Sequence, residues 1–477
     1  MKKSLLLGLG LAMTIGSANA ANIAIVDSGN DFKHKDLEAK AWVNPIEIPG
    51  NDRDEDKNGY PDDINGWNFA ESNNQLIDYS YEWSDTADVR RFFDVQLKSF
   101  LGTLTKEDRD WANAKLKEEK FIKDITVFGN WMHGTHVTGI AAKFSQDAKM
   151  IGAKLIPTEV KLPGQKSNSV TIATGDKKEE ISLADKGGVK DFLVKQALGA
   201  LAKQQSAVYG EIGGYLNSVK ADVMNGSFGT GYDQIGGVIA QLYQSIFKKA
   251  PTEAELKTYT DYFFEVAVKE SKIFLTSAPK TLFIFAAGND GSDNDLKPTT
   301  PTNVVGENKI SVAATLGDQA LASFSNYGVK NVEVAAPGVG ILSTSPMNKY
   351  IHVSGTSQAA PYVAGIAGAV KDANPSLDFR GIKKIILETV DVKSWLKGKV
   401  STSGLVNADR AVRAAVLSRS MDLTKAIAQS KLDVLPKSEG EKSVNAYYQV
   451  PKNWVQPLPS SIVCLLYTSD AADEGFC

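Results

Sequence analysis

Short apolar runs recur along the chain, and each of them ends in a polar or glycine-rich turn. Together with their turns, the runs cover residues 22–29, 221–229, 282–291, 309–314 and 332–338. Segments with a helical pattern separate them, so the order predicts an α/β fold with a mostly parallel, twisted sheet and helices on both faces. Because the carboxyl ends of parallel strands meet at one edge, we expect Asp27, Ser227 and Asn289 to gather there.

Three insertions interrupt this alternation. Residues 84–124 have a helical pattern, and residues 105–108 within them resemble a capping box. Residues 157–190 are rich in Lys, Gly, Ser and Thr, which favours an irregular surface excursion. Residues 236–272 predict a helical hairpin, because the pattern breaks at Pro251 and restarts at a second capping box.

The two ends of the chain differ from the predicted domain of residues 21–415. Residues 1–20 have the basic start, apolar stretch and small-residue cleavage motif of a signal peptide, so we expect an exported protein, periplasmic or secreted. Residues 416–463 have a weaker pattern and several prolines, which predicts a tail or linker. Residues 464–477 resemble a translated sequencing adapter and contain both cysteines. The rest of the chain therefore has neither a disulfide nor a thiol nucleophile.

Composition and charge argue against some classes of protein but do not identify the function. The chain has 477 residues, of which 43% are hydrophobic, and a formal net charge of −3. This length and apolar content are sufficient for a large core, and the charge argues against a nucleic-acid-binding protein. No segment is apolar over a length that predicts a transmembrane helix. The oligomeric state does not follow from the sequence.

One serine lies in a context that favours chemistry. Residues 353–361 (VSGTSQAAP) precede a run of small residues, which predicts a closely packed helix with Ser357 in or near its first turn. A helix N-terminus offers unpaired N–H groups and the positive end of the dipole, which suits an anion forming beside the serine. The alternative is that Ser357 only caps the helix.

A serine hydroxyl needs a neighbouring base to become a nucleophile, and the chain has four histidines. His133 and His136 open a segment of small residues, predicted to be a helix, and no third ligand accompanies them as a zinc site requires. His34 and His352 are interpreted as packing or structural residues. Because no histidine follows Ser357, the nucleophile–acid–base order of the α/β-hydrolases is excluded.

The remaining order is Asp27, His133, Ser357, which is the order in subtilisin. Three segments carry the resemblance: IVDSG at 25–29, HGTHVTG at 133–139 and GTSQAAP at 355–361. The chain resembles the subtilisin-like (subtilase) family of serine peptidases over roughly residues 21–415. The resemblance implies a three-layer subtilisin-like fold, with Asp27 orienting the base, His133 as the base and Ser357 as the nucleophile. His136 would be a packed residue of the same helix.

Two further segments resemble parts of that family's active site. Residues 283–291 (FIFAAGNDG) resemble the oxyanion segment, which implies that the side chain of Asn289 donates to the oxyanion. Residues 225–229 resemble the substrate-binding strand edge, which implies that the backbone of Ser227, Phe228 and Gly229 pairs with an extended peptide. Phe228 additionally indicates an apolar wall along the groove. Taken alone, residues 289–291 could be an ordinary turn.

An acidic loop is a candidate calcium site. Asp54, Asp56 and Asn58 place oxygen ligands at alternate positions before a glycine, as in the first half of an EF-hand loop, and Asp62 follows. The bidentate Glu of a complete EF-hand is absent, so a solvated acidic turn is the alternative. By resemblance to some subtilases, Asp36 is a further candidate ligand. We expect any Ca²⁺ bound there to be structural.

These observations predict an exported serine endopeptidase that acts on proteins or peptides through a Ser357 acyl-enzyme. Two alternatives stay open: a catalytically inactive binding or structural protein built on the same scaffold, and an esterase that uses the same triad. The preference for particular substrate side chains does not follow from the sequence.

Overall fold

The computed structural model describes residues 20–159 and 187–436, together with Trp454 and Pro459. Three predicted features therefore lie wholly or mostly outside the described residues: the signal peptide of residues 1–20, the excursion of residues 157–190 and the adapter-like residues 464–477. Among the described residues, no helix is long and apolar enough to span a membrane.

A ten-stranded sheet forms the centre of the molecule, in the order β11-β12-β8-β6-β5-β4-β1-β3-β2 with β7 beside β6. Its strands are β1 (Asn22–Asp27), β2 (Gly66–Asn68), β3 (Lys149–Lys154), β4 (Val223–Gly226), β5 (Leu282–Ala286), β6 (Lys309–Leu316), β7 (Ala320–Leu321), β8 (Val334–Pro337), β11 (Asp391–Val392) and β12 (Gly404–Leu405). Only the β6–β7 and β11–β12 pairs in this sheet are antiparallel, which confirms the predicted mostly parallel sheet. Strands β9 (Ile341–Ser345) and β10 (Lys349–Val353) form a separate hairpin.

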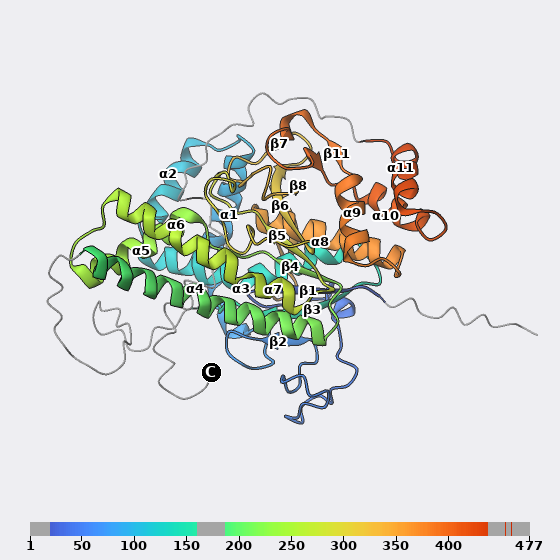
Figure 1. Cartoon of the computed structure of the whole chain (residues 1–477), viewed down its shortest axis with the longest axis horizontal. Coiled ribbons are helices and arrows are strands. Elements are labelled where there is room, and N and C mark those ends of the chain that lie inside the picture. Colours follow the sequence, from blue (N-terminus) through green and yellow to red (C-terminus); the bar gives the residue numbers. More distant parts are fainter. Residues whose placement is uncertain (1–19, 160–186, 437–453, 455–458, 460–477) are drawn as a thin grey trace, which may run out of the picture.

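Helices surround this sheet (Figure 1). The helices are α1 (Ala87–Phe100), α2 (Lys106–Lys115), α3 (Glu119–Ala142), α4 (Gly187–Ser218), α5 (Tyr232–Phe247), α6 (Glu253–Glu270), α7 (Lys272–Ser277), α8 (Thr356–Ala373), α9 (Phe379–Glu388), α10 (Ala408–Leu417) and α11 (Leu423–Asp433). Short 3-10 helices cover Glu38–Lys40, Tyr79–Ser84 and Ser394–Leu396. In Figure 1, α9, α10 and α11 gather at the end of the molecule opposite α2, α5 and α6.

The two faces of the sheet belong to two different hydrophobic clusters. Along β5, Ile284 packs with side chains of α3 and α8, whereas Phe283 and Phe285 pack with side chains of α4 and α7. Successive side chains of a strand point to opposite faces, so a strand covered on both faces must be apolar throughout. All five residues of β5 are buried. This is the three-layer arrangement that the sequence predicts.

Two of the insertions contain the helices that the sequence predicts. Helices α1 and α2 lie within residues 84–124, and the Thr105 hydroxyl caps α2 by accepting from the Asp108 N–H. Helices α5 and α6 form the hairpin of residues 236–272, and Thr252 and Glu255 complete its capping box at the start of α6.

Two boundaries differ from the prediction. Helix α3 begins at Glu119 and not at His133, because apolar side chains such as Phe121, Ile125 and Phe128 continue its buried face towards the N-terminus. The chain also does not become an extended tail at residue 416. Asp422 caps α11, whose Ile427 is buried in the main hydrophobic cluster together with α10.

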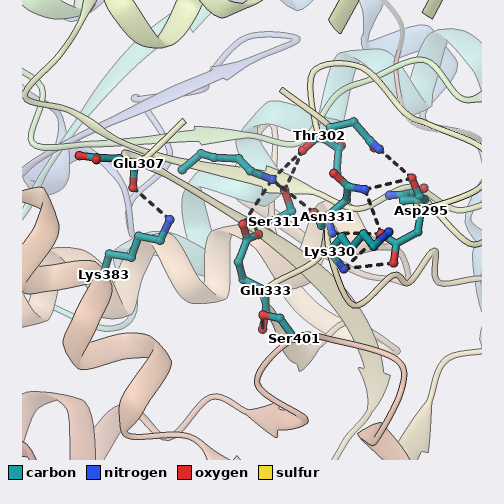
Figure 2. A network of polar contacts seen from close by, with 12 residues as sticks. Asp295, Thr302, Glu307, Ser311, Lys330, Asn331, Glu333, Lys383 and Ser401 are labelled. Carbon is teal, nitrogen blue, oxygen red and sulfur yellow. Dashed lines mark hydrogen bonds and ion pairs between the residues drawn. The ribbon is translucent and has the colours of Figure 1, made fainter. Parts of the chain in front are cut away.

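A polar network anchors loops to β6 at the end far from the predicted site (Figure 2). The buried amine of Lys309, the first residue of β6, donates to the Thr302 carbonyl at 2.8 Å and to the Ser311 hydroxyl at 2.9 Å. Glu333 lies 3.4 Å from the same amine and balances its charge. These partners of the buried amine are a backbone carbonyl, a hydroxyl and a carboxylate of β6 and neighbouring loops. We therefore interpret the network as one that stabilises this end of the sheet.

Candidate active site

Asp27 is the last residue of β1, and its side chain is completely buried. One carboxylate oxygen, Oδ1, accepts from His133 Nδ1 at 2.7 Å and from the Ser28 N–H at 2.7 Å. A carboxylate can only accept, so Nδ1 of His133 carries the proton. This leaves Nε2 of the neutral ring as the basic nitrogen, which is the tautomer that a general base for a serine requires.

The closeness of α3 to the β1 turn makes this hydrogen bond possible. The Gly134 N–H donates to the Ser28 hydroxyl at 3.1 Å, and a Cβ atom at Gly134 would lie only 2.9 Å from the Gly29 nitrogen and nearer still to its carbonyl oxygen. Gly29 itself has a φ of 115°, in the region that favours glycine. The two glycines therefore let His133 approach Asp27 from the middle of α3.

Ser357 is the second residue of α8 and is 3% exposed. Its hydroxyl Oγ lies 3.3 Å from the Ser227 carbonyl oxygen, and the Ser227 hydroxyl donates to the Ser357 carbonyl at 2.9 Å. The N-cap residue of α8 is Gly355, which makes no side-chain capping bond. The alternative that Ser357 merely caps the helix therefore does not match the structure.

Strands β1 and β4 bring the Asp27–His133 pair and Ser357 to the same edge of the sheet. The strands are parallel neighbours with Val26 beside Gly226, so the residues that follow, Asp27 and Ser227, end adjacent strands. Adjacent strands lie about 4.8 Å apart. Asp27 holds His133 and Ser227 contacts Ser357, and α3 packs against α8. The predicted acid, base and nucleophile thus belong to one edge of the sheet.

Asn289 follows β5 at the same edge. Its Oδ1 accepts from the Thr356 N–H at 2.9 Å and from the Thr356 hydroxyl at 2.8 Å, which fixes the direction of the amide. A Cβ atom at Gly355 would lie 3.4 Å from Asn289 Nδ2 and 3.6 Å from the Ser357 nitrogen. Asn289 Nδ2 and the Ser357 nitrogen therefore border the same space beside Gly355, together with the side-chain oxygen of Gln358.

The other histidines have different environments. His136 is completely buried, its Nε2 lies 3.1 Å from the carbonyl oxygens of Ile341 and Ile351, and burial lowers its pKa to about 3. It connects α3 to the β9–β10 hairpin as a neutral ring. His34 is buried against the Lys349 carbonyl, and His352 is exposed on β10. Of the four histidines, only His133 contacts a buried carboxylate.

The predicted substrate strand edge, Ser227 to Gly229, directly follows β4 and is buried. The side chain of Phe228 is completely buried in the cluster between the sheet and α4, 5.9 Å from the ring of Tyr209. It therefore does not form the apolar wall of a groove, because alternation along the chain turns it into the core. The Gly229 N–H donates to the Pro459 carbonyl at 2.9 Å.

Part of the candidate calcium loop comes together in the structure. Carboxylate oxygens of Glu47, Asp54 and Asp56 all lie within 4.8 Å of one another. Glu47 was missed by sequence reasoning because it precedes the EF-hand-like pattern. It is drawn in by the loop backbone, since its Oε1 accepts from the N–H groups of Glu55 and Asp56.

The other candidate ligands have other partners. The two oxygens of Asp62 accept backbone N–H groups of the turn at Gly50 and Asp52, so Asp62 shapes the loop and is not in the carboxylate group. Asp36 is exposed and accepts from the Tyr350 hydroxyl at 2.6 Å, and it also lies outside that group. Asn58 stays in the loop, where its N–H donates to Asp56 at 3.0 Å.

Comparison with known proteins places the chain in a family. Residues 18–419 match the sequence model of the subtilase family. The chain belongs to the subtilase family. Subtilases are serine peptidases, so a peptide-bond hydrolase is the function class of the family. The resemblance carried by the Asp27, His133 and Ser357 segments is thereby confirmed at the level of the family.

Two similar subtilases come from Plasmodium falciparum and a Bacillus species. Subtilisin-like protease 1 of Plasmodium falciparum (isolate 3D7) is 24% identical over 406 residues, which are 84% of this chain and 44% of that protein. Alkaline elastase YaB of Bacillus sp. (strain YaB) is 35% identical over 155 residues, 31% of this chain and 37% of that protein. The chain thus spans less than half the length of these relatives.

Solved structures that are similar to the chain have low sequence identity to it. A cold-adapted subtilisin-like serine proteinase is 16% identical and has a TM-score of 0.40, with 82% of this chain and 88% of that chain covered. The A-subunit of the AB5 toxin from E. coli is also 16% identical, with a TM-score of 0.45 and coverage of 84% and 94%.

Proposed function

We propose that this chain is an exported serine endopeptidase that hydrolyses peptide bonds of proteins or peptides through an acyl-enzyme on Ser357. The observation that carries the proposal is the buried hydrogen bond between Asp27, at the end of β1, and His133 of α3. Strand β4 lies beside β1, and Ser227, which follows β4, contacts Ser357. The signal-peptide pattern of residues 1–20 supports export.

In this mechanism, His133 Nε2 takes the proton of the Ser357 hydroxyl as Oγ attacks the carbonyl carbon of the scissile bond. Asp27 holds the ring and stabilises the imidazolium that forms. His133 then gives the proton to the leaving amine, and the peptide bond breaks to leave an ester on Ser357. A water molecule, deprotonated by His133, hydrolyses the ester and regenerates the serine.

The negative charge on the carbonyl oxygen would be stabilised by Asn289 Nδ2 and the Ser357 N–H. The bonds from Thr356 orient the Asn289 amide before substrate arrives, so little reorganisation is needed during the reaction. Loss of the equivalent donor in subtilisin itself lowers kcat by about 10²–10³. We expect a loss of the same order for Asn289→Ala in this chain, measured as kcat for a fluorogenic peptide.

A fluorophosphonate probe tests the proposed nucleophile. The wild type should be labelled, Ser357→Ala should not, and Ser354→Ala should retain labelling as the matched serine control in the same stretch. Circular dichroism establishes that each variant is folded. Folded wild type without Ser357-dependent labelling would contradict the proposal and favour a binding or structural protein. Labelling with hydrolysis of esters but not of casein would favour the esterase.

We further propose that Glu47, Asp54 and Asp56 hold a structural Ca²⁺. Their carboxylate oxygens are hard ligands of the kind that Ca²⁺ prefers, and their mutual repulsion favours a cation between them. The ion would stabilise the loop and take no part in peptide hydrolysis.

A further inference from the structure

The substrate strand edge already has a partner from the same chain. The N–H of Gly229 donates to the carbonyl of Pro459 at 2.9 Å. Under the proposed function, this N–H is one of the groups that would pair with an extended substrate. A backbone N–H has one hydrogen to donate, so Pro459 and a substrate carbonyl exclude each other at Gly229.

A second described residue near Pro459 in the sequence, Trp454, also contacts the domain. Trp454 is completely buried and belongs to the main hydrophobic cluster. The side-chain amide of Gln96, a buried residue of α1, donates to the Trp454 carbonyl. Trp454 and Pro459 are five positions apart, a separation that an extended chain spans with at most about 18 Å. The indole is therefore an anchor that keeps Pro459 close to Gly229. Both residues precede the adapter-like sequence that begins at residue 464.

Because residue 459 is a proline, it can form only one of the two backbone hydrogen bonds that another residue could form at this position. Proline has no N–H, so Pro459 can accept from Gly229 but cannot donate to a carbonyl of the strand edge. A substrate residue other than proline at that position could do both. The pairing through Pro459 is therefore weaker than pairing with such a substrate, and a substrate at sufficient concentration displaces it.

We propose that Pro459 is a built-in competitor of extended substrates at Gly229 and that Trp454 is its anchor. This inference rests on the proposed function, because it requires residues 227–229 to bind substrate. A tethered segment acts at an effective concentration on the order of millimolar. If it occupies the strand edge about nine-tenths of the time, the KM for an extended peptide is about tenfold higher than without it.

Kinetics of the full chain test this competition. We expect Trp454→Ala to lower KM for a fluorogenic tetrapeptide about tenfold with kcat unchanged. Labelling of Ser357 by a small fluorophosphonate should stay the same, because the probe does not need Gly229. Trp42→Ala is the matched control, since Trp42 is also buried, at 9% exposure, but packs in the cluster on the other face of the sheet. Its KM should equal that of the wild type.

Two further measurements keep the test decisive. Gln96→Glu replaces the donor to the Trp454 carbonyl by an acceptor, so it should also lower KM while leaving the indole in place. A synthetic peptide with the sequence of residues 450–463 should inhibit the Trp454→Ala variant competitively with the tetrapeptide. If Trp454→Ala does not fold, Gln96→Glu decides.

The outcomes separate the two proposals. Without Ser357-dependent labelling in any folded variant, the proposed function fails. With such labelling but equal KM values in wild type, Trp454→Ala and Gln96→Glu, the competitor is refuted while the function stands. Inhibition by the peptide that lowers kcat without changing KM would likewise overturn competition at the strand edge.

Discussion

Replacing Gly134 by alanine should misplace the catalytic base without removing any functional group. The added methyl carbon would lie 2.9 Å from the nitrogen and 3.0 Å from the carbonyl carbon of Gly29. The Gly29 carbonyl oxygen would lie nearer still. Unstrained contacts with such atoms need about 3.5 Å, so α3 must move away from the β1 turn by roughly 1 Å. The obstacle is backbone on both sides, and a side-chain rotation cannot relieve it.

The shift acts directly on the pair formed by His133 and Asp27. His133 precedes Gly134 on α3, and its Nδ1 lies 2.7 Å from Asp27 Oδ1. A misplacement of about 1 Å in an active site can cost about 10²-fold in rate. We therefore expect Gly134→Ala to lower kcat/KM by about 10–100-fold, and the free energy of unfolding by about 1–3 kcal/mol as for other overpacked sites.

Steady-state hydrolysis of a fluorogenic peptide and urea unfolding measure the two effects. Gly237→Ala is the matched control, because Gly237 lies exposed inside α5 and a Cβ atom there would meet nothing within 4 Å. That variant should retain full activity and gain up to about 1 kcal/mol from the higher helix propensity of alanine. If Gly134→Ala keeps kcat/KM within about twofold of the wild type, close docking of α3 does not position the base.

Three further predictions concern the acid, the buried histidine and the metal loop. Asp27→Asn should lower kcat by about 10⁴-fold with an unchanged circular dichroism spectrum, because an amide does not select the required tautomer of His133; a loss below about tenfold would contradict this role. For His136, the pKa is about 3 in the folded protein and 6.5 ordinarily, so the unfolded chain binds the additional proton below about pH 6.5. The free energy of unfolding should therefore fall by about 1 kcal/mol per pH unit from about pH 6.5 towards pH 3, and urea unfolding of His136→Gln should show a shallower dependence over this range. Chelation should lower the Tm of the wild type; calcium at about 100 times its Kd should restore about 3 kcal/mol of stability. Asp54→Asn should abolish the calcium response and Asp36→Asn should retain it, whereas equal responses in both variants would refute the proposed ligand set.

The parallel sheet could be predicted because the apolar runs and the turns that indicate it are short segments of the sequence. Strand β5, for example, is apolar along its whole length, since both of its faces are covered, and it is followed by a glycine-containing turn. Asp27, His133 and Ser357 lie in segments whose order and surroundings resemble the subtilase family, so the candidate triad could be assigned before any geometry was known.

Other features depend on contacts between residues far apart in the chain. Helix α3 starts at Glu119 because its apolar face packs against other elements. The small-residue segment at His133 looks like the start of a separate helix, so the sequence does not indicate that one helix runs through it. Phe228 lies on a strand edge, but its ring turns into the core. Glu47 joins the acidic loop only because N–H groups of that loop bind its carboxylate.

The sequence by itself therefore determined the fold class, the family and the residues that carry the proposed chemistry, because strand pattern, turn composition and residue order are properties of short segments. Only the tertiary structure decided which nitrogens border the space beside Gly355, which carboxylates meet in the acidic loop, and that Pro459 pairs with Gly229. These contacts join residues that are distant in sequence. No local pattern encodes them, because they arise only when the packed elements fix the positions of their side chains and backbone groups.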